Sequence, residues 1–256
     1  MSIDEVIKYV VHKLGASGID HPVFYNFPVG IRFEIGTGEI FDNDRNPLPE
    51  YINQAVNRAD QISHKIFPTK PDVLAFELFV ESEKKANELV NGFLDKNYIF
   101  ESETISQDVV EYCLDFQNIS EFLHEFREKI TQIAPHEIVV NKIEDDEDTL
   151  WHLFLYWDLS CCCIDLHNLF KEIVLADFGG VLHPLTSSIY LFAIEHPLLF
   201  HLYDDRGLDV IAADCVSLIP IYKEFDKWIL NYDRERIDAL FSSCEKKNAL
   251  KDYMSR

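Results

Sequence analysis

The chain has 256 residues, of which 47% are hydrophobic, and it carries 45 acidic against 23 basic side chains, a formal net charge of −22. This length and composition are typical of a globular protein with a sizeable core. The negative field repels phosphate backbones and anionic headgroups and attracts basic proteins, so we expect no direct nucleic-acid or membrane partner. A charge that serves only solubility and a charge that recruits a basic protein partner both stay open. No apolar run approaches the ~20 residues of a membrane-spanning helix.

The segment from Ser2 to Leu14 predicts an amphipathic helix. Ser2 and Glu5 have the spacing of a capping box, apolar residues recur every three or four positions, and Gly15 follows as a C-cap. The segment lacks the basic region and the cleavage site of a signal peptide. The six cysteines include no Cys-x-x-Cys pair, so we expect reduced thiols, no zinc site and a cytoplasmic protein.

Two apolar segments follow at 21–26 and 31–35, separated by the turn sequence FPVG. Their patterns predict a hairpin over residues 23–35. A second helix is expected along the next apolar stripe, and Pro68 ends it. Its predicted core-facing residues are Ile52, Ala55, Ala59 and Ile62.

The middle of the chain alternates between strand and helix patterns. The segment DVLAFELFV, residues 72–80, predicts a buried strand, and the tetrad DDED, residues 145–148, predicts the acidic tip of a hairpin. The other expected elements are a helix at 83–95, strands at 98–102 and 109–114, a helix at 118–133, and the hairpin strands at 136–143 and 150–159.

A helix capped by Ser160 is predicted to run as far as Gly179. Phe170 and Ile173 lie on its apolar stripe and are expected to face the core. The pattern SSIYLFAI, residues 187–194, then indicates another strand.

The last part of the chain predicts a hairpin over residues 198–211, with Gly207 supplying the positive φ that its turn needs. Two helices are expected to close the chain, at 214–230 and at 234–251. Asp233 has the position of an N-cap for the second helix.

Short turns between neighbouring strands favour an antiparallel sheet with helices packed on it, an α+β fold. We expect either a single unit over residues 1–256 or two tightly packed halves, at about 1–134 and 135–256. The two predicted hairpins both begin with His-Pro and lead into an amphipathic helix. An ancient duplication and a coincidence of hairpin patterns therefore both stay open.

The stretch HLYDDRGLDVIA contains the candidate binding residues Asp204, Asp205, Arg206 and Asp209. Paired carboxylates can hold a metal or act as general acid and base when a pocket supplies a third partner. Charged turns also form because Asp binds local amides and Arg pairs with nearby Asp. We favour a structural turn, with Arg206 paired to Asp204 or Asp209, whose exposed acids are available to a partner.

A second candidate set is Asp72 with Glu83, Lys84 and Lys85, the residue types that hold magnesium in one nuclease superfamily. That chemistry places the acids at strand ends, whereas Glu83 is expected to open a helix. The acidity of the chain also opposes DNA binding. We therefore assign no metal site to this set.

Other chemical motifs are weaker. The thiols of Cys161, Cys162 and Cys163 are expected near a helix start, where thiolate character rises, although packing is the favoured role. The sequence has no phosphate-binding glycine loop and no Gly-x-Ser-x-Gly elbow, so we expect no cofactor.

The stretches FYNFPVGIRFEIG, LYDDRGLDVIA and YKEFDKWILNYDRERIDALF resemble an uncharacterised bacterial family, known from Gram-positive genomes as a domain of unknown function. The likeness is most specific toward the C-terminus. It implies a bacterial cytoplasmic protein, and it transfers no activity to any residue.

Two classes of function fit these patterns. The favoured one is a non-catalytic binding protein, such as an immunity-type antitoxin that neutralises a basic effector, because charge drives association and no complete catalytic set is present. The alternative is a metal-dependent, nuclease-like hydrolase that uses Asp204, Asp205 and Asp209, or Asp72 and Glu83. Whether the protein is an enzyme stays open at this point.

Overall fold

The computed structural model describes residues 1–80, 82–84, 86–87, 126–144, 149–176, 178 and 188–254. In these residues, seven strands form one antiparallel sheet with the order β1-β7-β6-β5-β2-β4-β3. The predicted α+β class is confirmed. The strands are β1 (Gly30–Glu34), β2 (Val73–Val80), β3 (Glu137–Glu144), β4 (Thr149–Asp158), β5 (Ser188–Ala193), β6 (Leu198–Leu202) and β7 (Gly207–Ala212).

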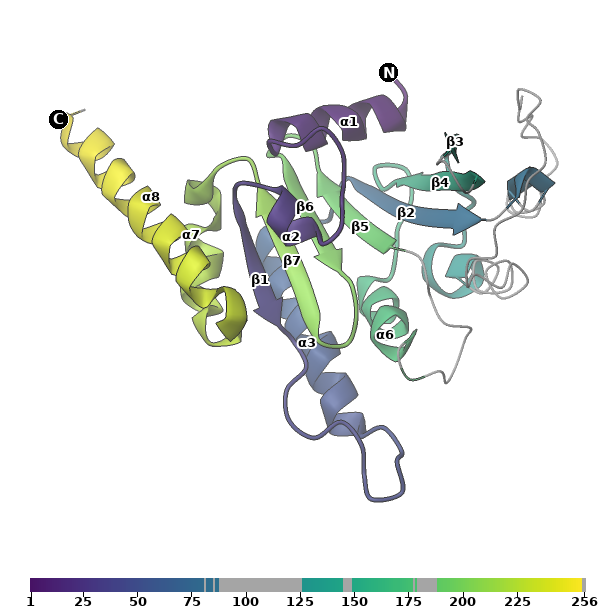
Figure 1. The fold of residues 1–256 in the computed structure, drawn as a ribbon, viewed down its shortest axis with the longest axis horizontal. Coiled ribbons are helices and arrows are strands. Elements are labelled where there is room, and N and C mark those ends of the chain that lie inside the picture. The colour runs from purple at the N-terminus through teal and green to yellow at the C-terminus, as the bar shows by residue number, and fades with distance from the viewer. Residues whose placement is uncertain are drawn as a thin grey trace.

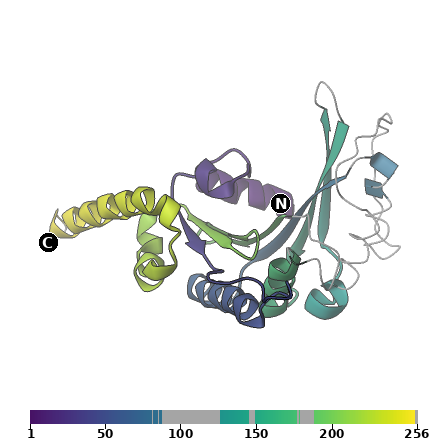
Figure 2. The ribbon, with the colours of Figure 1, turned by 60° about the horizontal axis from the view of Figure 1, so that its bottom comes forward.

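Helices cover both faces of the sheet (Figure 1 and Figure 2). Helices α1 and α2 lie on one face, and α3, α6 and α7 lie on the other, while α8 extends away from the sheet. The helices are α1 (Ile3–Lys13), α2 (Val23–Asn26), α3 (Pro49–Ile66), α6 (Leu166–Ala176), α7 (Cys215–Glu224) and α8 (Arg234–Met254), with a π-helical turn η1 (Arg127–Thr131) and the 3-10 turns η2 (Asp226–Trp228) and η3 (Asn231–Asp233). None of the helices described is long and apolar enough to cross a membrane.

Burial on both faces explains why the central strands are almost continuously apolar. Along β4, Trp151, Leu153, Leu155 and Trp157 point into the core beneath α3 and α6, whereas Tyr156 belongs to the smaller core beneath α1. The predicted core-facing positions of α3 and α6 are confirmed, except that Ile52 is only half-buried.

The first helix forms as its sequence predicts. The Ser2 hydroxyl accepts the Glu5 N–H at 3.1 Å, and the Glu5 carboxylate accepts the Ser2 N–H at 3.0 Å, so the capping box is complete. The edge strand β3 adds a further cap, because the Glu137 carboxylate accepts the Ile3 N–H at 2.5 Å. This helix end is therefore fixed to the sheet as well as to itself.

The predicted hairpin over residues 23–35 is wrong, because its first segment is helix α2 and β1 pairs with β7 instead. The α2 side chains explain the difference, since the rings of Phe24 and Tyr25 pack against the Arg32 guanidinium, 5.2 and 4.9 Å from its centre. This contact with β1 overrides the local strand propensity. The hairpin formed by β6 and β7 is confirmed.

Two helix boundaries also differ from the prediction. The helix expected after Ser160 begins only at Leu166, where the Asp165 carboxylate accepts the Asn168 N–H at 3.1 Å and caps it. The helix expected at 214–230 ends at Glu224 and is followed by η2 and η3. The chain beyond it turns back to cover the edge strand β1, with Leu230 N–H donating to the Arg32 carbonyl at 3.0 Å.

The expectation of reduced cysteines is wrong for one pair. Cys215 and Cys244 form a disulfide that joins α7 to α8, with a Cα–Cα distance of 6.2 Å. The pair is separated by 29 residues, and no local sequence pattern announces it. Cys161, Cys162 and Cys163 are free thiols.

Several predicted elements lie outside the described residues. These are most of the helix at 83–95, the strands at 98–102 and 109–114, the first part of the helix at 118–133, and the acidic tip at 145–148. The strands that flank this tip, β3 and β4, do pair as an antiparallel hairpin.

Candidate functional site

The turn between β6 and β7 is held together by Asp204. Its carboxylate accepts the N–H groups of Arg206 and Gly207 at 2.8 and 2.9 Å, and the Arg206 guanidinium donates to its other oxygen at 2.9 Å. The predicted pairing of Arg206 with Asp204 is confirmed. The pair is local and solvent-facing, with the Arg206 side chain 70% exposed, so its contribution to stability is small.

The side chain of Asp205 points away from the solvent, toward the face of the sheet that α3 covers. It is buried, and the hydroxyl of Tyr51 donates to its carboxylate at 2.7 Å. Burial, together with this hydrogen bond, raises the pKa of Tyr51. The contact fixes the turn to the start of α3.

Gly207 is needed for a reason that differs from the predicted one. Positive φ among the glycines described occurs at Gly15 and Gly38, so the prediction of a left-handed Gly207 is wrong. A Cβ on Gly207 would instead lie 1.8 Å from the Tyr203 hydroxyl oxygen. The missing side chain makes room for the Tyr203 ring.

Asp209 lies on the α1 and α2 face, fully buried in the sheet. Both of its oxygens accept from the Arg32 guanidinium, at 2.7 and 2.9 Å, and one also accepts the Phe24 N–H at 3.1 Å. Burial raises the pKa of Asp209, and the Arg32 guanidinium opposes this shift. The bidentate geometry is that of a specific ion pair.

The four candidates therefore do not form one site. Asp204 and Arg206 remain on the turn, and Asp209 is paired with Arg32 on one side of the sheet. Asp205 is bound to Tyr51 of α3 on the other side, with its Oδ1 4.0 Å from the Arg206 Nε. The expectation of exposed acids is therefore wrong for Asp205 and Asp209, which are buried.

Asp72 and Glu83 are also kept apart. Asp72 precedes β2 and accepts the Ile194 N–H at 2.8 Å, while Glu83 lies in a helical segment beyond the far end of this strand. The eight residues of β2, at a rise of about 3.3 Å each, place Asp72 and Glu83 much farther apart than two ligands of one metal ion can be. Among the residues that the structure describes, no group of three or more His, Cys, Asp or Glu side chains could hold a metal.

The structure reveals a polar centre that the sequence patterns did not indicate. Glu77 is buried in the middle of β2, with the His152 Nε2 2.6 Å from its Oε1. Its Oε2 accepts a short hydrogen bond from the Tyr190 hydroxyl and lies 3.3 Å from the His21 Nε2. His21 also lies 2.9 Å from the Tyr190 hydroxyl and 3.3 Å from the Ser188 hydroxyl.

Electrostatics keep this centre charged. Burial would raise the pKa of Glu77, but the hydrogen bonds from His152, His21 and Tyr190 outweigh it and lower the pKa to about 2. Burial raises the pKa of Tyr190, which therefore stays a donor. The neighbouring His201 is completely buried, and burial lowers its pKa to about 4, so this imidazole is neutral near pH 7.

His21 connects this buried centre to the surface. Its side chain is 44% exposed, while that of Glu77 is only 3% exposed. A carboxylate that orients one nitrogen of an exposed imidazole leaves the other nitrogen to exchange protons. One sequence signal could have found the centre, because Glu77 is the single charged residue in the strand VLAFELFV.

The free cysteines lie in a loop before α6 and not at a helix start. Cys161 and Cys163 are exposed, and Cys162 is buried with its thiol 3.3 Å from the Asp158 carbonyl. Burial raises the pKa of Cys162 to about 11. The thiolate character that a helix start would give is therefore not supported at Cys162.

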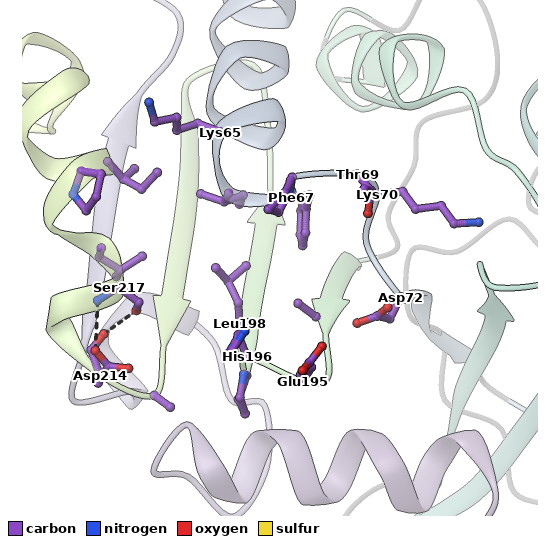
Figure 3. A pocket seen from close by; sticks show the side chains of 18 residues that line it. Lys65, Phe67, Thr69, Lys70, Asp72, Glu195, His196, Leu198, Asp214 and Ser217 are labelled. Carbon is purple, nitrogen blue, oxygen red and sulfur yellow. Dashed lines mark hydrogen bonds between the residues drawn. The ribbon is translucent and has the colours of Figure 1, made fainter.

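A cleft of about 620 Å³ opens between the end of α3, the first turns of α7 and the turn that joins β5 to β6 (Figure 3). Its lining combines apolar side chains with charged ones, among them Lys70, Asp72, Glu195 and Asp214. Neither the polar centre at Glu77 nor the turn at Asp204 opens into this cleft, because none of their residues lines it.

Comparison with known proteins places the chain in one family. It belongs to the family described as a domain of unknown function (DUF3885), whose model matches residues 7–233. This confirms the resemblance to an uncharacterised domain. No curated protein and no solved structure matches the chain.

Proposed function

We propose that this protein is a non-catalytic binding protein that captures a basic protein partner, as an immunity-type antitoxin captures its effector. One observation carries the proposal. The chain has a net charge of −22, yet in the described part the buried acidic side chains are four, each bound to an internal donor. They are Glu77, Asp205, Asp209 and Asp233, whose donors include His152, Tyr51, Arg32 and Tyr25.

Among the described residues, most of the acidic side chains are therefore at least partly exposed to solvent. Surface charge of one sign attracts a partner of the other sign over a distance of about one Debye length, ~8 Å at physiological salt. It therefore speeds the encounter and rejects acidic competitors. The same field disfavours a nuclease-like role, because nucleic acid is an anion.

The test is to identify and reconstitute the partner. The tagged protein is used to capture proteins from its native host, and each candidate is purified and mixed with it again. We expect a basic protein that forms a stoichiometric complex, with an association rate constant that falls about tenfold between low and high salt. An acidic partner, or an association rate that does not depend on salt, would contradict the proposal.

A second candidate function is acid–base chemistry at His21, favoured by the exposed imidazole on the buried Glu77 carboxylate. A simple activated ester, p-nitrophenyl acetate, probes the reactivity of this imidazole. If the centre is reactive, wild-type protein cleaves the ester faster than His21→Gln. Equal rates would remove this candidate without affecting the proposed binding role.

A further inference from the structure

The cleft in Figure 3 has an apolar floor. The buried side chains of Phe67, Leu198, Leu218 and Ile221 line it, and Figure 3 shows Phe67 and Leu198 extending into it from opposite sides. A volume of about 620 Å³ lies within the range of ordinary ligand pockets. The space is large enough to take an aliphatic or aromatic side chain of another molecule.

Three carboxylates lie around this floor, and each keeps acceptor capacity. Asp72 accepts the Ile194 N–H through Oδ2, and Asp214 accepts the Ser217 N–H through Oδ1, at 2.8 and 3.0 Å. These bonds fix the carboxylates and leave the other oxygen of each for a further donor. Glu195 is exposed on the turn between β5 and β6, and Figure 3 shows it between Asp214 at one end of the cleft and Asp72 at the other.

The two lysines of the cleft are already engaged. Lys65 forms an ion pair with Glu224, and Lys70 donates to the carbonyl of Leu159. Figure 3 shows Lys70 directed away from the cleft. The charge that the cleft offers to a ligand is therefore mainly negative.

We infer that this cleft seats an apolar side chain of a basic partner polypeptide, flanked by Lys or Arg residues that meet Asp72, Glu195 and Asp214. The inference rests on the proposed function and names where its partner docks. An apolar anchor in a pocket with charges around it is the usual arrangement of a binding hot spot. A second copy of the chain fits less well, because both copies carry −22.

The experiment uses a labelled peptide in which one leucine stands between two pairs of lysines. Its affinity is measured by fluorescence anisotropy against a cleft variant, Asp72→Asn with Glu195→Gln and Asp214→Asn. The amide oxygens keep the two backbone hydrogen bonds. A matched control removes three exposed acids elsewhere, with Glu39→Gln, Asp44→Asn and Glu50→Gln, so both variants have the same net charge.

We expect the cleft variant to bind the peptide about tenfold more weakly than wild type, since three charge pairs at a few tenths of a kcal/mol each amount to about one decade. The control variant should change less than about twofold. Equal losses in the two variants would overturn the cleft as the docking site, and the wider proposal of electrostatic capture would still stand.

A second variant tests the apolar anchor without changing charge. Ala213 lines the cleft and is exposed, so Ala213→Trp should fill the cleft and leave the fold intact. We expect Ala213→Trp to lower the affinity for the peptide about tenfold. Replacing the leucine of the peptide by serine should lower the affinity of wild type by a similar factor. Unchanged affinity in either case would overturn the inference. If the wild-type protein forms a dimer and Ala213→Trp abolishes it, the cleft binds a second copy of the chain, and the inference is likewise overturned.

Discussion

Glu77 in the sheet and the carboxylates around the cleft are the same chemical group in two different situations. Glu77 is bound by His152, Tyr190 and His21. Its side chain is buried, so water could not take the place of these donors if one were removed. Asp72 accepts one hydrogen bond from a backbone N–H, that of Ile194, and Glu195 is exposed. Removing a partner inside leaves an unpaired buried charge, whereas removing one outside leaves a hydrated group. The comparison indicates which acids maintain the fold and which are available for binding.

The largest effect is expected at Asp209. Asp209→Ala leaves the Arg32 guanidinium buried without its carboxylate, so the free energy of unfolding should fall by about 3–5 kcal/mol in denaturant titration. The matched control is Lys223→Ala, which breaks the exposed pair with Glu245 and should cost no more than about 1 kcal/mol. Similar losses in both variants would erase the distinction between buried and exposed pairs.

Glu77 should give the protein a sensitivity to acid. The pKa of Glu77 is about 2 in the folded chain and 4.5 ordinarily, so its stabilisation is complete above about pH 4.5 and is lost as the pH falls through 2. The shift corresponds to a contribution on the order of 3 kcal/mol. In Glu77→Gln, the free energy of unfolding should depend less steeply on pH in this window than in wild type. An unchanged slope would contradict the low pKa of Glu77.

His201 should act in a higher window. The pKa of this imidazole falls from 6.5 to about 4 on folding, so the unfolded chain binds the proton more strongly. Stability is therefore full above about pH 6.5 and declines as the pH falls to 4. His201→Gln should remove this decline. The exposed His196→Gln is the control, and an equal effect of both variants would show that burial of His201 is not the cause.

Gly207 tests the packing beside the turn. Gly207→Ala places a Cβ against the Tyr203 ring, which must move off the Arg32 guanidinium, 5.4 Å from the ring centre. We expect a loss of about 1–3 kcal/mol. Gly18→Ala is the control, because a Cβ there meets nothing within 4 Å. If Gly207→Ala and Gly18→Ala have the same melting temperature, close packing against Tyr203 is not the reason that a glycine is needed at position 207.

The smallest effect on stability is expected at the cleft. The variant with Asp72→Asn, Glu195→Gln and Asp214→Asn keeps the backbone hydrogen bonds of its side chains, so its free energy of unfolding should stay within about 0.5 kcal/mol of wild type. A larger loss in denaturant titration would place these acids among the structural ones.

The sequence predicts well what depends on neighbours along the chain. The capping box of α1, the stripe of α3 and the hairpin of β6 and β7 are all local patterns, and all three form. The structure departs from the prediction where a distant partner decides. Helix α2 forms beside Arg32 where a strand was expected, and Cys215 finds Cys244.

The candidate site shows the same limit. The residues around Glu77 come from three other segments, with His21, His152 and Tyr190 separated from it by 56, 75 and 113 residues. The partner of Asp209 lies 177 residues away. Because the sequence does not show which residues are partners in space, a carboxylate can be predicted equally well to be catalytic or to belong to a buried ion pair.

The most direct test compares Glu77→Gln with the cleft variant in one assay, the affinity of the lysine–leucine peptide at pH 7 below the melting temperature of both. We expect Glu77→Gln to bind the peptide as wild type does, although it unfolds more easily. The cleft variant should keep its stability and bind about tenfold more weakly. The reverse pattern, with affinity lost in Glu77→Gln and retained in the cleft variant, would contradict the division between structural and binding carboxylates.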